Sequence, residues 1–352
     1  MKIIIVYVVH AIIRRHSILK VFHIDFTCSI KVRSQPSSHG LCTILHMSEL
    51  HSRSDRFVAI MGNPYSGAKD NRARVEGLVT ALHDLQIPTQ MIWDLKAREL
   101  CLADPGFKSQ CRCLVIAGGD GTVAGVTGLC HELPTAILPL GNENLLAKEL
   151  GFHRSVQEIA SAIHAAKVRH IDLGMVNDQP FTIMVSCGFD ADVVQRVTEW
   201  RRTPDGQRRV KHHSYAKPAM ESVLHYNFPR ISLIVDGKQV DGFELLVFNV
   251  NRYATGLSFV PDAKLDDGHL HWVMWKKPGR LSLLRFLYLV KTGKHIGHPH
   301  VAVGHARSMN VISSQPTPVQ LDGDLLGNTP LILSIKPQAL PIIDMSAASI
   351  SR

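Results

Sequence analysis

The spacing of hydrophobic and polar residues changes near residue 171, and this change divides the chain into two parts with different expected elements. In the first part, short uninterrupted apolar runs alternate with segments whose apolar residues recur every three or four positions. The runs predict strands that are covered on both faces, and the segments predict helices. In the second part, short apolar or alternating segments are separated by Asp-Gly or glycine-rich turns, which predicts a β-rich domain.

Strands and helices are expected to alternate between residues 57 and 151. After a turn rich in Asn, Pro, Ser and Gly, one helix is marked by the apolar positions Val75, Leu78, Val79, Leu82 and Leu85. The strands are expected at 57–61, 89–95, 111–119 and 135–141, and the helices at 75–85, 97–102, 122–132 and 142–151. This alternation predicts an open, mostly parallel α/β sheet.

The second part is expected to contain many short strands and one helix. The strands are expected at 181–188, 230–237, 243–250, 268–275, 305–313, 317–323 and 331–337. The helix is expected at 280–293. Its apolar residues, which include Leu281 and Leu287, favour packing in a core over anchoring in a membrane.

The first 46 residues are expected to form an extension outside the fold. An apolar stretch at 3–13 ends at Arg14 and Arg15, and it is shorter than the roughly 20 residues of a membrane-spanning helix. It also lacks the small-residue cleavage site of a secretory signal. Met47 is a natural start for the folded chain, which favours an upstream start codon as the origin of the extension. A membrane-associated leader is the alternative interpretation.

Composition and charge narrow the class of protein. A content of 45% hydrophobic and 20% charged residues in 352 residues is typical of a globular protein with sizeable cores. The formal charge of +9 and the pI near 9.3 favour anionic partners such as phosphates, anionic lipid headgroups or nucleic acid. Seven cysteines without a CxxC pair argue against a disulfide framework or a zinc site, and favour a cytoplasmic, reducing location.

The stretch LVIAGGDGTVAGV, from Leu114 to Val126, predicts a phosphate-binding turn between a buried strand and a helix. The free backbone N–H groups and the positive dipole end of a helix N-terminus favour an anion, and glycine lets a phosphate approach the backbone. Asp120 would repel a bare phosphate, which suggests a nucleotide with Mg²⁺ or a ribose contact. The stretch matches neither the Rossmann nor the Walker fingerprint.

Several motifs, in order along the chain, resemble those of the diacylglycerol kinase catalytic domain family, which sphingosine kinases and bacterial lipid kinases share. The first three are NPYSG at 63–67, GGDGT at 118–122 and LPLGNENLLAKELG at 138–151. The later ones are the hairpin and GFDA turn at 171–194, PDAKLDDGHLHWV at 261–273, QLDGD at 320–324 and the closing strand at 333–343. GGDGT alone also occurs in NAD kinases and, in related form, in phosphofructokinases.

This resemblance, which covers about residues 56 to 345, implies a fold and a domain organisation. The fold implied is an N-terminal open α/β domain that binds the nucleotide, followed by a β-rich sandwich domain, with the active site in the cleft between them. The expected boundaries are an extension at 1–54, the α/β domain at 55–170, the lipid-substrate domain at 171–335, and a C-terminal return to the first domain with a tail at 336–352.

The resemblance also implies an activity and its residues. The activity is ATP- and Mg²⁺-dependent transfer of phosphate to a hydroxyl of diacylglycerol or a similar lipid. The nucleotide-binding residues would be Asn63, Pro64, Ser66, Gly67, Gly118, Gly119, Asp120, Gly121, Thr122, Gly141 and Asn142. Asp324 replaces the family's catalytic glutamate as the base. Asp322, expected on the same side of an extended strand, would help to hold Mg²⁺ or raise the basicity of Asp324.

A structural Mg²⁺ site and a membrane partner are implied as well. Asp267 matches the aspartate that binds this ion in bacterial members, where the backbone carbonyls of Lys264 and His269 would assist it. The partner would be a lipid at the membrane surface, so the expected location is cytoplasmic with peripheral membrane association; homodimer formation stays open. The cationic run at 201–217 is a solvated loop or a contact to anionic headgroups.

Two departures from the family pattern leave alternatives open. Aspartate at 324 shortens the base by one methylene, and the usual GTxND reads Gly141, Asn142, Glu143, Asn144, Leu145. A compensated variant kinase is the preferred interpretation, with an inactive or retargeted kinase as the alternative. A kinase of a soluble acceptor such as NAD and a non-catalytic nucleotide or nucleic-acid binder are the other hypotheses, and nucleic-acid motifs are absent from the sequence.

Overall fold

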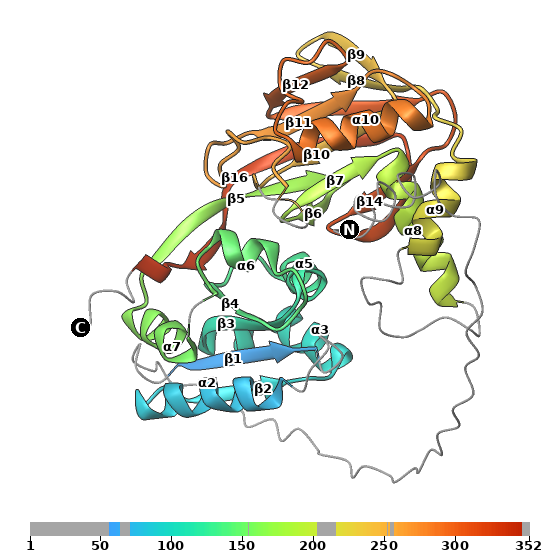
Figure 1. Ribbon diagram of the computed structural model, residues 1–352. Coiled ribbons are helices and arrows are strands. Elements are labelled where there is room, and N and C mark those ends of the chain that lie inside the picture. The colour runs from blue at the N-terminus through green and yellow to red at the C-terminus, as the bar shows by residue number, and fades with distance from the viewer. Residues whose placement is uncertain are drawn as a thin grey trace, which may run out of the picture.

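The computed structural model describes residues 56–63, 71–153, 155–202, 216–251, 253 and 257–346. Two β-sheets form the centre of this part of the molecule (Figure 1). One sheet has ten strands and begins in the first half of the chain, whereas the other has six strands, all from the second half. The expected extension at 1–54 and its two interpretations lie outside the described residues.

The first half of the chain builds the parallel part of the larger sheet. Its strands are β1 (Phe57–Gly62), β2 (Thr89–Ile92), β3 (Cys111–Gly118) and β4 (Thr135–Pro139), in the spatial order β2-β1-β3-β4. All three pairings are parallel, so the expected α/β alternation is confirmed. The connecting helices are α2 (Arg72–Asp84), α3 (Leu95–Ala103), α4 (Pro105–Gln110), α5 (Asp120–Leu129), α6 (Leu145–Glu149) and α7 (Val156–Ala165).

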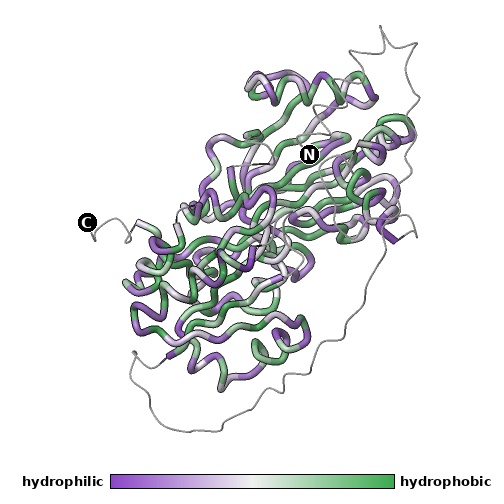
Figure 2. Tube along the Cα trace, turned by 60° about the horizontal axis from the view of Figure 1, so that its bottom comes forward, coloured by the Kyte–Doolittle hydropathy of each residue, from purple (hydrophilic) through white to green (hydrophobic). Residues whose placement is uncertain are grey.

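Burial explains why the two hydrophobic patterns give these elements. The residues of β3 from Cys113 to Ala117 are inaccessible to solvent, as expected for a strand covered on both faces. In α2 the buried residues are Val75, Leu78 and Leu82, which lie about one turn apart. Helix α7 packs beside α2. Figure 2 shows hydrophobic residues concentrated in the central strands and hydrophilic residues on the outer helices.

The described residues of the second half add strands to both sheets and three helices. The strands are β5 (Val168–Val176), β6 (Gln179–Phe181), β7 (Met184–Cys187), β8 (Ile231–Val235), β9 (Lys238–Gly242), β10 (Glu244–Phe248), β11 (Leu270–Trp275), β12 (Val301–Ala306), β13 (Ser308–Ser313), β14 (Pro318–Leu321), β15 (Asp324–Asn328) and β16 (Leu331–Ile343). The helices are α8 (Phe189–Arg202), α9 (Ala216–His225) and α10 (Arg280–Lys291).

The antiparallel strands of the second half form a sandwich. The smaller sheet has the order β12-β11-β10-β7-β14-β15, and β8 and β13 extend the larger sheet. A single buried cluster joins residues from both sheets, among them Val247 and Trp272 from the smaller sheet and Leu233 and Val311 from the larger one. The expected fold class, an α/β domain followed by a β-sandwich, is therefore confirmed.

Strand β16 ties the two parts of the fold together. It pairs antiparallel with β13 and β5 and, through Ile342 and Thr135, parallel with β4. Figure 1 shows β5 and β16 running side by side from the sandwich to the α/β part. The larger sheet is thus continuous, and the expected boundaries at residues 170 and 335 fall inside these two strands; the boundaries themselves stay a prediction.

Three details of the expected elements are wrong. Helix α5 begins at Asp120 rather than at 122, because Gly119 already caps it, and it ends at Leu129. The helix expected at 142–151 is the short α6. The second half holds α8 and α9 besides the single expected helix, since the apolar residues after the GFDA turn, such as Val193 and Val197, lie at helical spacing.

No helix among the described residues is long and apolar enough to cross a membrane.

Candidate active site

Two glycine-rich turns meet at the carboxyl ends of β3 and β4. Gly119 and Gly141 lie so close that a Cβ placed on Gly141 would be 2.5 Å from the Cα of Gly119. A Cβ on Gly118 would be 2.4 Å from the Cβ of Thr122, which is also buried. Glycine is therefore required at these positions for backbone packing, and α5 begins directly after Gly119 in the same turn.

Asn144 fixes the second turn, although the sequence did not mark it as a site residue. Its backbone is left-handed, with a φ of 51°, a conformation that Asn tolerates better than most residues. Its side chain accepts a hydrogen bond from the Gly141 amide at 2.9 Å and donates one to the Gly141 carbonyl at 2.8 Å. The neighbouring Asn142, which was expected to bind the nucleotide, is exposed.

The carboxylate of Asp120 bridges the two turns. Its Oδ1 accepts a hydrogen bond of 3.4 Å from the Leu146 amide at the start of α6. Burial raises the pKa of Asp120, and the amides of Leu145 and Leu146 oppose this rise. Backbone amides of the next turn thus engage this carboxylate, and the ligand or cation that the sequence suggested at Asp120 stays a prediction.

The end of β1 joins the same edge of the sheet. The Asn63 amide donates to the Ala117 carbonyl at 3.2 Å, next to Gly118. Below it lies Arg98, only 4% exposed, whose guanidinium donates to the Gly62 carbonyl. Burial lowers the pKa of Arg98, opposed by the charge of Asp94.

Helix α2 clamps the start of the second turn. The Asn71 side chain donates to the Leu140 carbonyl at 3.2 Å, and Arg74 donates to the Pro139 carbonyl at 3.0 Å. The end of β1 and the turns after β3 and β4 thus converge at the carboxyl ends of parallel strands, where open α/β sheets bind ligands. Three further expected residues of the first segment, Pro64, Ser66 and Gly67, lie outside the described residues.

Asp322 and Asp324 do not share one side of a strand, and this part of the prediction is wrong. Asp322 and Gly323 have φ values of 48° and 96°, and Leu321 pairs with Asp324 across them. They form a two-residue hairpin turn in which both central residues are left-handed. A turn of this kind reverses the chain, so the two carboxylates point in different directions.

Asp322 is a structural residue. Its buried carboxylate accepts hydrogen bonds from the amides of Thr182, Ile183 and Met184 at 2.8–2.9 Å, and from the Thr182 hydroxyl at 3.0 Å. Burial raises the pKa of Asp322, and these four hydrogen bonds oppose the rise. Both of its oxygens are thus occupied, so this geometry does not support the expected role of Asp322 in holding Mg²⁺.

Asp324 faces the nucleotide turn instead. Its Oδ2 would lie 3.7 Å from a Cβ built on Gly121, in the first turn of α5. The residue is open to solvent on one side, and none of the described residues donates a hydrogen bond to its carboxylate. The surrounding protein raises its pKa by desolvation, and the charge of Arg201 opposes this rise. A free carboxylate of raised pKa has the properties of a general base.

Gln320 supports the Asp324 turn from below and was missed as a site residue. Its side-chain oxygen accepts a 2.8 Å hydrogen bond from the Gly323 amide, and its Nε2 donates to Asp190 Oδ2 at 3.2 Å. Asp190 in turn accepts hydrogen bonds from the hydroxyls of Ser186 and Tyr253. The GFDA segment, which the sequence had marked as a motif, thereby holds the turn in place.

Replacement of Gln320 by leucine should test this support. The variant leaves the Gly323 amide without its partner, so we expect turnover to fall about tenfold while the apparent affinity for nucleotide changes little, because the α5 turn is untouched. Steady-state kinetics would separate these two parameters. A rise in the nucleotide KM with unchanged kcat would contradict a role in positioning Asp324.

A buried acid lies behind this network at the N-terminus of α8. Glu244, 4% exposed, accepts hydrogen bonds from the amides of Phe189 and Asp190. Burial raises its pKa well above the ordinary value, and the charge of Asp190 adds to the rise. The other ionisable groups near it are Asp192, Cys187 and Tyr226. The folded state therefore favours the protonated form of Glu244.

The free energy of unfolding should consequently depend on pH through Glu244. A carboxyl whose pKa is raised on folding contributes most below its unfolded pKa, and this contribution is lost as the pH rises to the folded pKa. We therefore expect Glu244→Gln to gain stability relative to the wild type between pH 5 and pH 7.5. Urea unfolding at the two pH values measures this; an unchanged difference between the two proteins would contradict the raised pKa.

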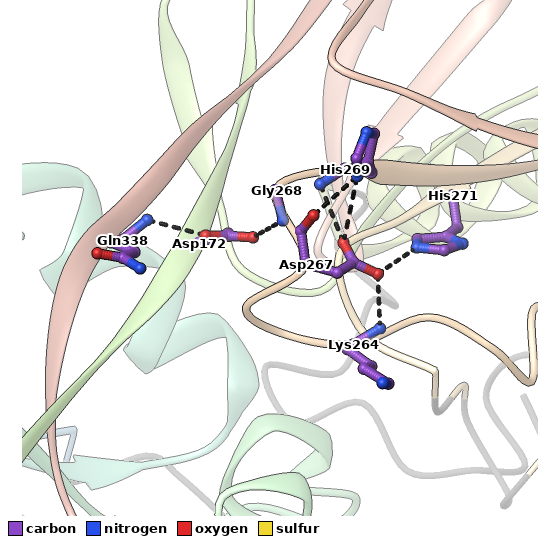
Figure 3. A network of polar contacts seen from close by, with 7 residues as sticks. All are labelled: Asp172, Lys264, Asp267, Gly268, His269, His271 and Gln338. Carbon is purple, nitrogen blue, oxygen red and sulfur yellow. Dashed lines mark hydrogen bonds and ion pairs between the residues drawn. The ribbon is translucent and has the colours of Figure 1, made fainter.

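The carboxylate of Asp267 is engaged by groups of its own turn and by a neighbouring histidine (Figure 3). The carboxylate accepts hydrogen bonds from the amides of Lys264 and His269 at 3.3 and 3.0 Å, and lies 2.8 Å from His271 Nε2. Lys264 and His269 thus contact the carboxylate through their N–H groups, and the expected contribution of their carbonyl oxygens to an ion stays a prediction. No cluster of three or more His, Cys, Asp or Glu side chains suited to a metal ion occurs in the described part of the chain.

Asp172 holds this turn in place. Its buried carboxylate accepts hydrogen bonds from the amides of Gly268 and Gln338, at 2.6 and 2.8 Å (Figure 3). This contact joins the turn to β16, so the Asp267 segment is held by protein groups. The structural Mg²⁺ expected at this turn stays a prediction.

Comparison with known proteins agrees with the fold. The profile of the diacylglycerol kinase catalytic domain matches residues 57–176, and that of the YegS C-terminal NAD kinase beta sandwich-like domain matches residues 183–344. The structure of a diacylglycerol kinase from Bacillus anthracis str. Sterne superimposes with a TM-score of 0.59 at 18% identity, covering 82% of this chain and 97% of that one.

Curated relatives extend over most of the chain. The diacylglycerol kinase of Staphylococcus carnosus (strain TM300) is 24% identical over 279 residues, which are 77% of this chain and 89% of the relative. That of Bacillus subtilis (strain 168) is 27% identical over 225 residues, or 62% of this chain and 72% of the relative.

These findings define the class of protein as a two-part kinase with an α/β catalytic domain and a β-sandwich. Within this class, residues 57–176 match the diacylglycerol kinase catalytic domain, and the curated relatives of the chain are diacylglycerol kinases.

Proposed function

We propose that this protein is an ATP- and Mg²⁺-dependent lipid kinase, which transfers the γ-phosphate of ATP to a hydroxyl of diacylglycerol or a related lipid and forms phosphatidic acid or a similar phospholipid. The position of Asp324 opposite the first turn of α5 carries this proposal. It places a candidate base, 3.7 Å from a Cβ built on Gly121, beside a turn suited to phosphate.

The nucleotide turn would bind the phosphates of ATP through backbone groups. The first amides of α5 have no partner within the helix, and the helix dipole adds positive potential at this end. Glycine at 118, 119, 121 and 141 keeps side chains out of the approach. Mg²⁺ bound with ATP would neutralise part of the phosphate charge. Asp120 is the carboxylate in this turn whose oxygen atoms could bind the Mg²⁺ ion.

The transfer step would use Asp324 as the base. Its carboxylate accepts the proton of the acceptor hydroxyl while the hydroxyl oxygen forms a bond to the γ-phosphorus. The bond between that phosphorus and the bridging oxygen to the β-phosphate breaks, and ADP leaves with the electron pair. Gln320 keeps the base in position through the Gly323 amide. The aspartate side chain is one methylene shorter than the family's glutamate, so the acceptor must approach the turn more closely.

Transfer of labelled phosphate from Mg-ATP to detergent-dispersed lipids, with NAD as the soluble control acceptor, tests the proposal. We expect label in diacylglycerol or a related lipid and none in NAD. Label in NAD alone would favour the soluble-acceptor kinase. Nucleotide binding without transfer to any acceptor would instead favour a catalytically inactive relative, in which the changes at Asn142 and Asp324 have removed the activity.

A further inference from the structure

The chain carries an acid-free segment in its second half. From Gly268 to Leu321 it contains no aspartate or glutamate. Its lysines and arginines are Lys276, Lys277, Arg280, Arg285, Lys291, Lys294 and Arg307. Acidic side chains neutralise cations on most protein surfaces. A segment of this length that carries positive charges and no negative ones therefore indicates an anionic partner.

Helix α10 displays the first part of this charge together with apolar side chains. Leu281 is 80% exposed and Tyr288 is 59% exposed, and Arg285 lies between them at helical spacing. The opposite face of α10 is buried and includes Phe286 and Val290, as expected for core packing. The outer face therefore combines cations with large apolar groups that nothing among the described residues covers.

A cavity of about 750 Å³ opens beside this face. It lies between the segment that follows α9 and the start of α10, and Arg280, one of its lining residues, donates to the Leu224 carbonyl. Tyr226 and Phe228 form an aromatic wall, with their ring centroids 5.0 Å apart. The cationic lining comes from Lys277, Arg280 and Arg285. Cations beside an aromatic wall suit an amphiphile with an anionic head.

Hydrogen bonds hold the loop that carries the lysine. The Trp275 indole donates to the Ser282 hydroxyl at 3.0 Å, and Ser282 donates to the Lys277 carbonyl at 2.9 Å. This loop is therefore fixed against the start of α10. Tyr226 also packs on Phe189, at the start of α8 near the candidate active site, with ring centroids 6.0 Å apart.

We propose that the α10 surface, formed by Lys277, Arg280, Leu281, Arg285 and Tyr288, binds the anionic phospholipid surface of a membrane, with a lipid phosphate in the adjoining cavity. Cations near such a surface are attracted to it, and exposed leucine and tyrosine enter its interfacial layer. Nucleic acid fits less well, because an 80% exposed leucine has no favourable partner there. The proposal rests on the proposed function, since it would bring the enzyme to a lipid acceptor.

Vesicle co-sedimentation of the full chain tests this surface without any catalytic step. We expect binding to vesicles of phosphatidylcholine with 30% phosphatidylglycerol, and at least tenfold weaker binding to phosphatidylcholine alone, roughly as the loss of charge attraction predicts. Lys277→Glu combined with Arg285→Glu should weaken binding to the anionic vesicles about tenfold or more, and Leu281→Asp should weaken it to a similar degree.

Matched controls use exposed residues elsewhere. Ile332→Asp changes another exposed aliphatic residue, 62% exposed on β16, and Lys167→Glu reverses a cation in the α7–β5 connection. Both should bind anionic vesicles like the wild type. Equal binding by the α10 variants and the controls would overturn the proposal. So would displacement of the protein from vesicles by millimolar inorganic phosphate, which would indicate a free-phosphate site, or tighter binding to an RNA oligonucleotide than to vesicles.

Activity assays separate this inference from the proposed function. The α10 variants should phosphorylate lipid in neutral detergent micelles like the wild type, but should lose activity on anionic vesicles. Equal loss in micelles and vesicles would overturn the docking role. If the wild type transfers no phosphate at all, the proposed function fails, and the co-sedimentation result still decides whether the surface binds membranes.

Discussion

Replacement of Asp324 by alanine is expected to lower turnover by roughly 10²- to 10⁴-fold, the range for loss of a general base, while nucleotide binding stays nearly unchanged. The reason is positional. The carboxylate lies opposite Gly121 and accepts no hydrogen bond from any described residue, so it is available to a substrate proton. The nucleotide turn is held by Asn144 and by close packing of Gly119 on Gly141, neither of which the substitution touches.

Two further variants and a pH profile sharpen this prediction. Asp324→Asn keeps the shape but cannot accept the proton, so it should be as inactive as the alanine variant, whereas Asp324→Glu should retain measurable activity. Because desolvation raises the pKa of Asp324 and the base acts when deprotonated, activity should rise with pH through that raised pKa. Turnover within threefold of the wild type in the asparagine variant would contradict a base at this position.

Replacement of Asp322 by alanine is expected to lower the free energy of unfolding by about 3 kcal/mol or more. The substitution leaves three backbone amides and the Thr182 hydroxyl without their common acceptor. Each buried donor without a partner costs about 1–3 kcal/mol. The left-handed backbone at Asp322 adds strain for alanine, because its φ is 48°.

Urea unfolding measures this loss, and Asp324→Ala serves as the matched control. It removes a carboxylate two residues away in the same hairpin, and should change the free energy of unfolding by less than about 1 kcal/mol, as is usual for an exposed position. The substitution at Asp322 would then lower the free energy of unfolding, whereas the substitution at Asp324 would lower turnover. Similar stabilities of the two alanine variants would contradict the structural role of Asp322.

The nucleotide turn was largely predictable because its signals are local. An apolar run covered on both faces, followed by glycines, predicts a buried strand that ends in a helix, and β3 and α5 have this form. The same local reasoning found Gly141, whose close approach to Gly119 permits no side chain. It could not find Asn144 or Gln320, because an amide side chain carries no periodic signal and its partners come from the folded arrangement.

The acidic residues show the limit of local reasoning most clearly. Spacing placed Asp322 beside Asp324 on a strand, but the left-handed hairpin turned them apart. Asp267 matched a metal ligand by motif, and the structure adds that its carboxylate accepts hydrogen bonds from the amides of Lys264 and His269. A motif indicates which residue is present, whereas only the folded backbone shows which groups contact its side chain.

By itself, the sequence determined the two-part fold and the order of most strands along the chain, because hydrophobic periodicity and glycine positions act over a few residues. Its motifs carried the resemblance to the diacylglycerol kinase family. The tertiary structure alone decided which carboxylate is free and which is saturated, that one continuous strand, β16, makes the expected C-terminal return to the first part, and that α10 presents Leu281 to solvent. These features depend on contacts between residues far apart in the chain. Such contacts, for example the 138- to 140-residue separation between Asp322 and its donors, leave no pattern in neighbouring positions.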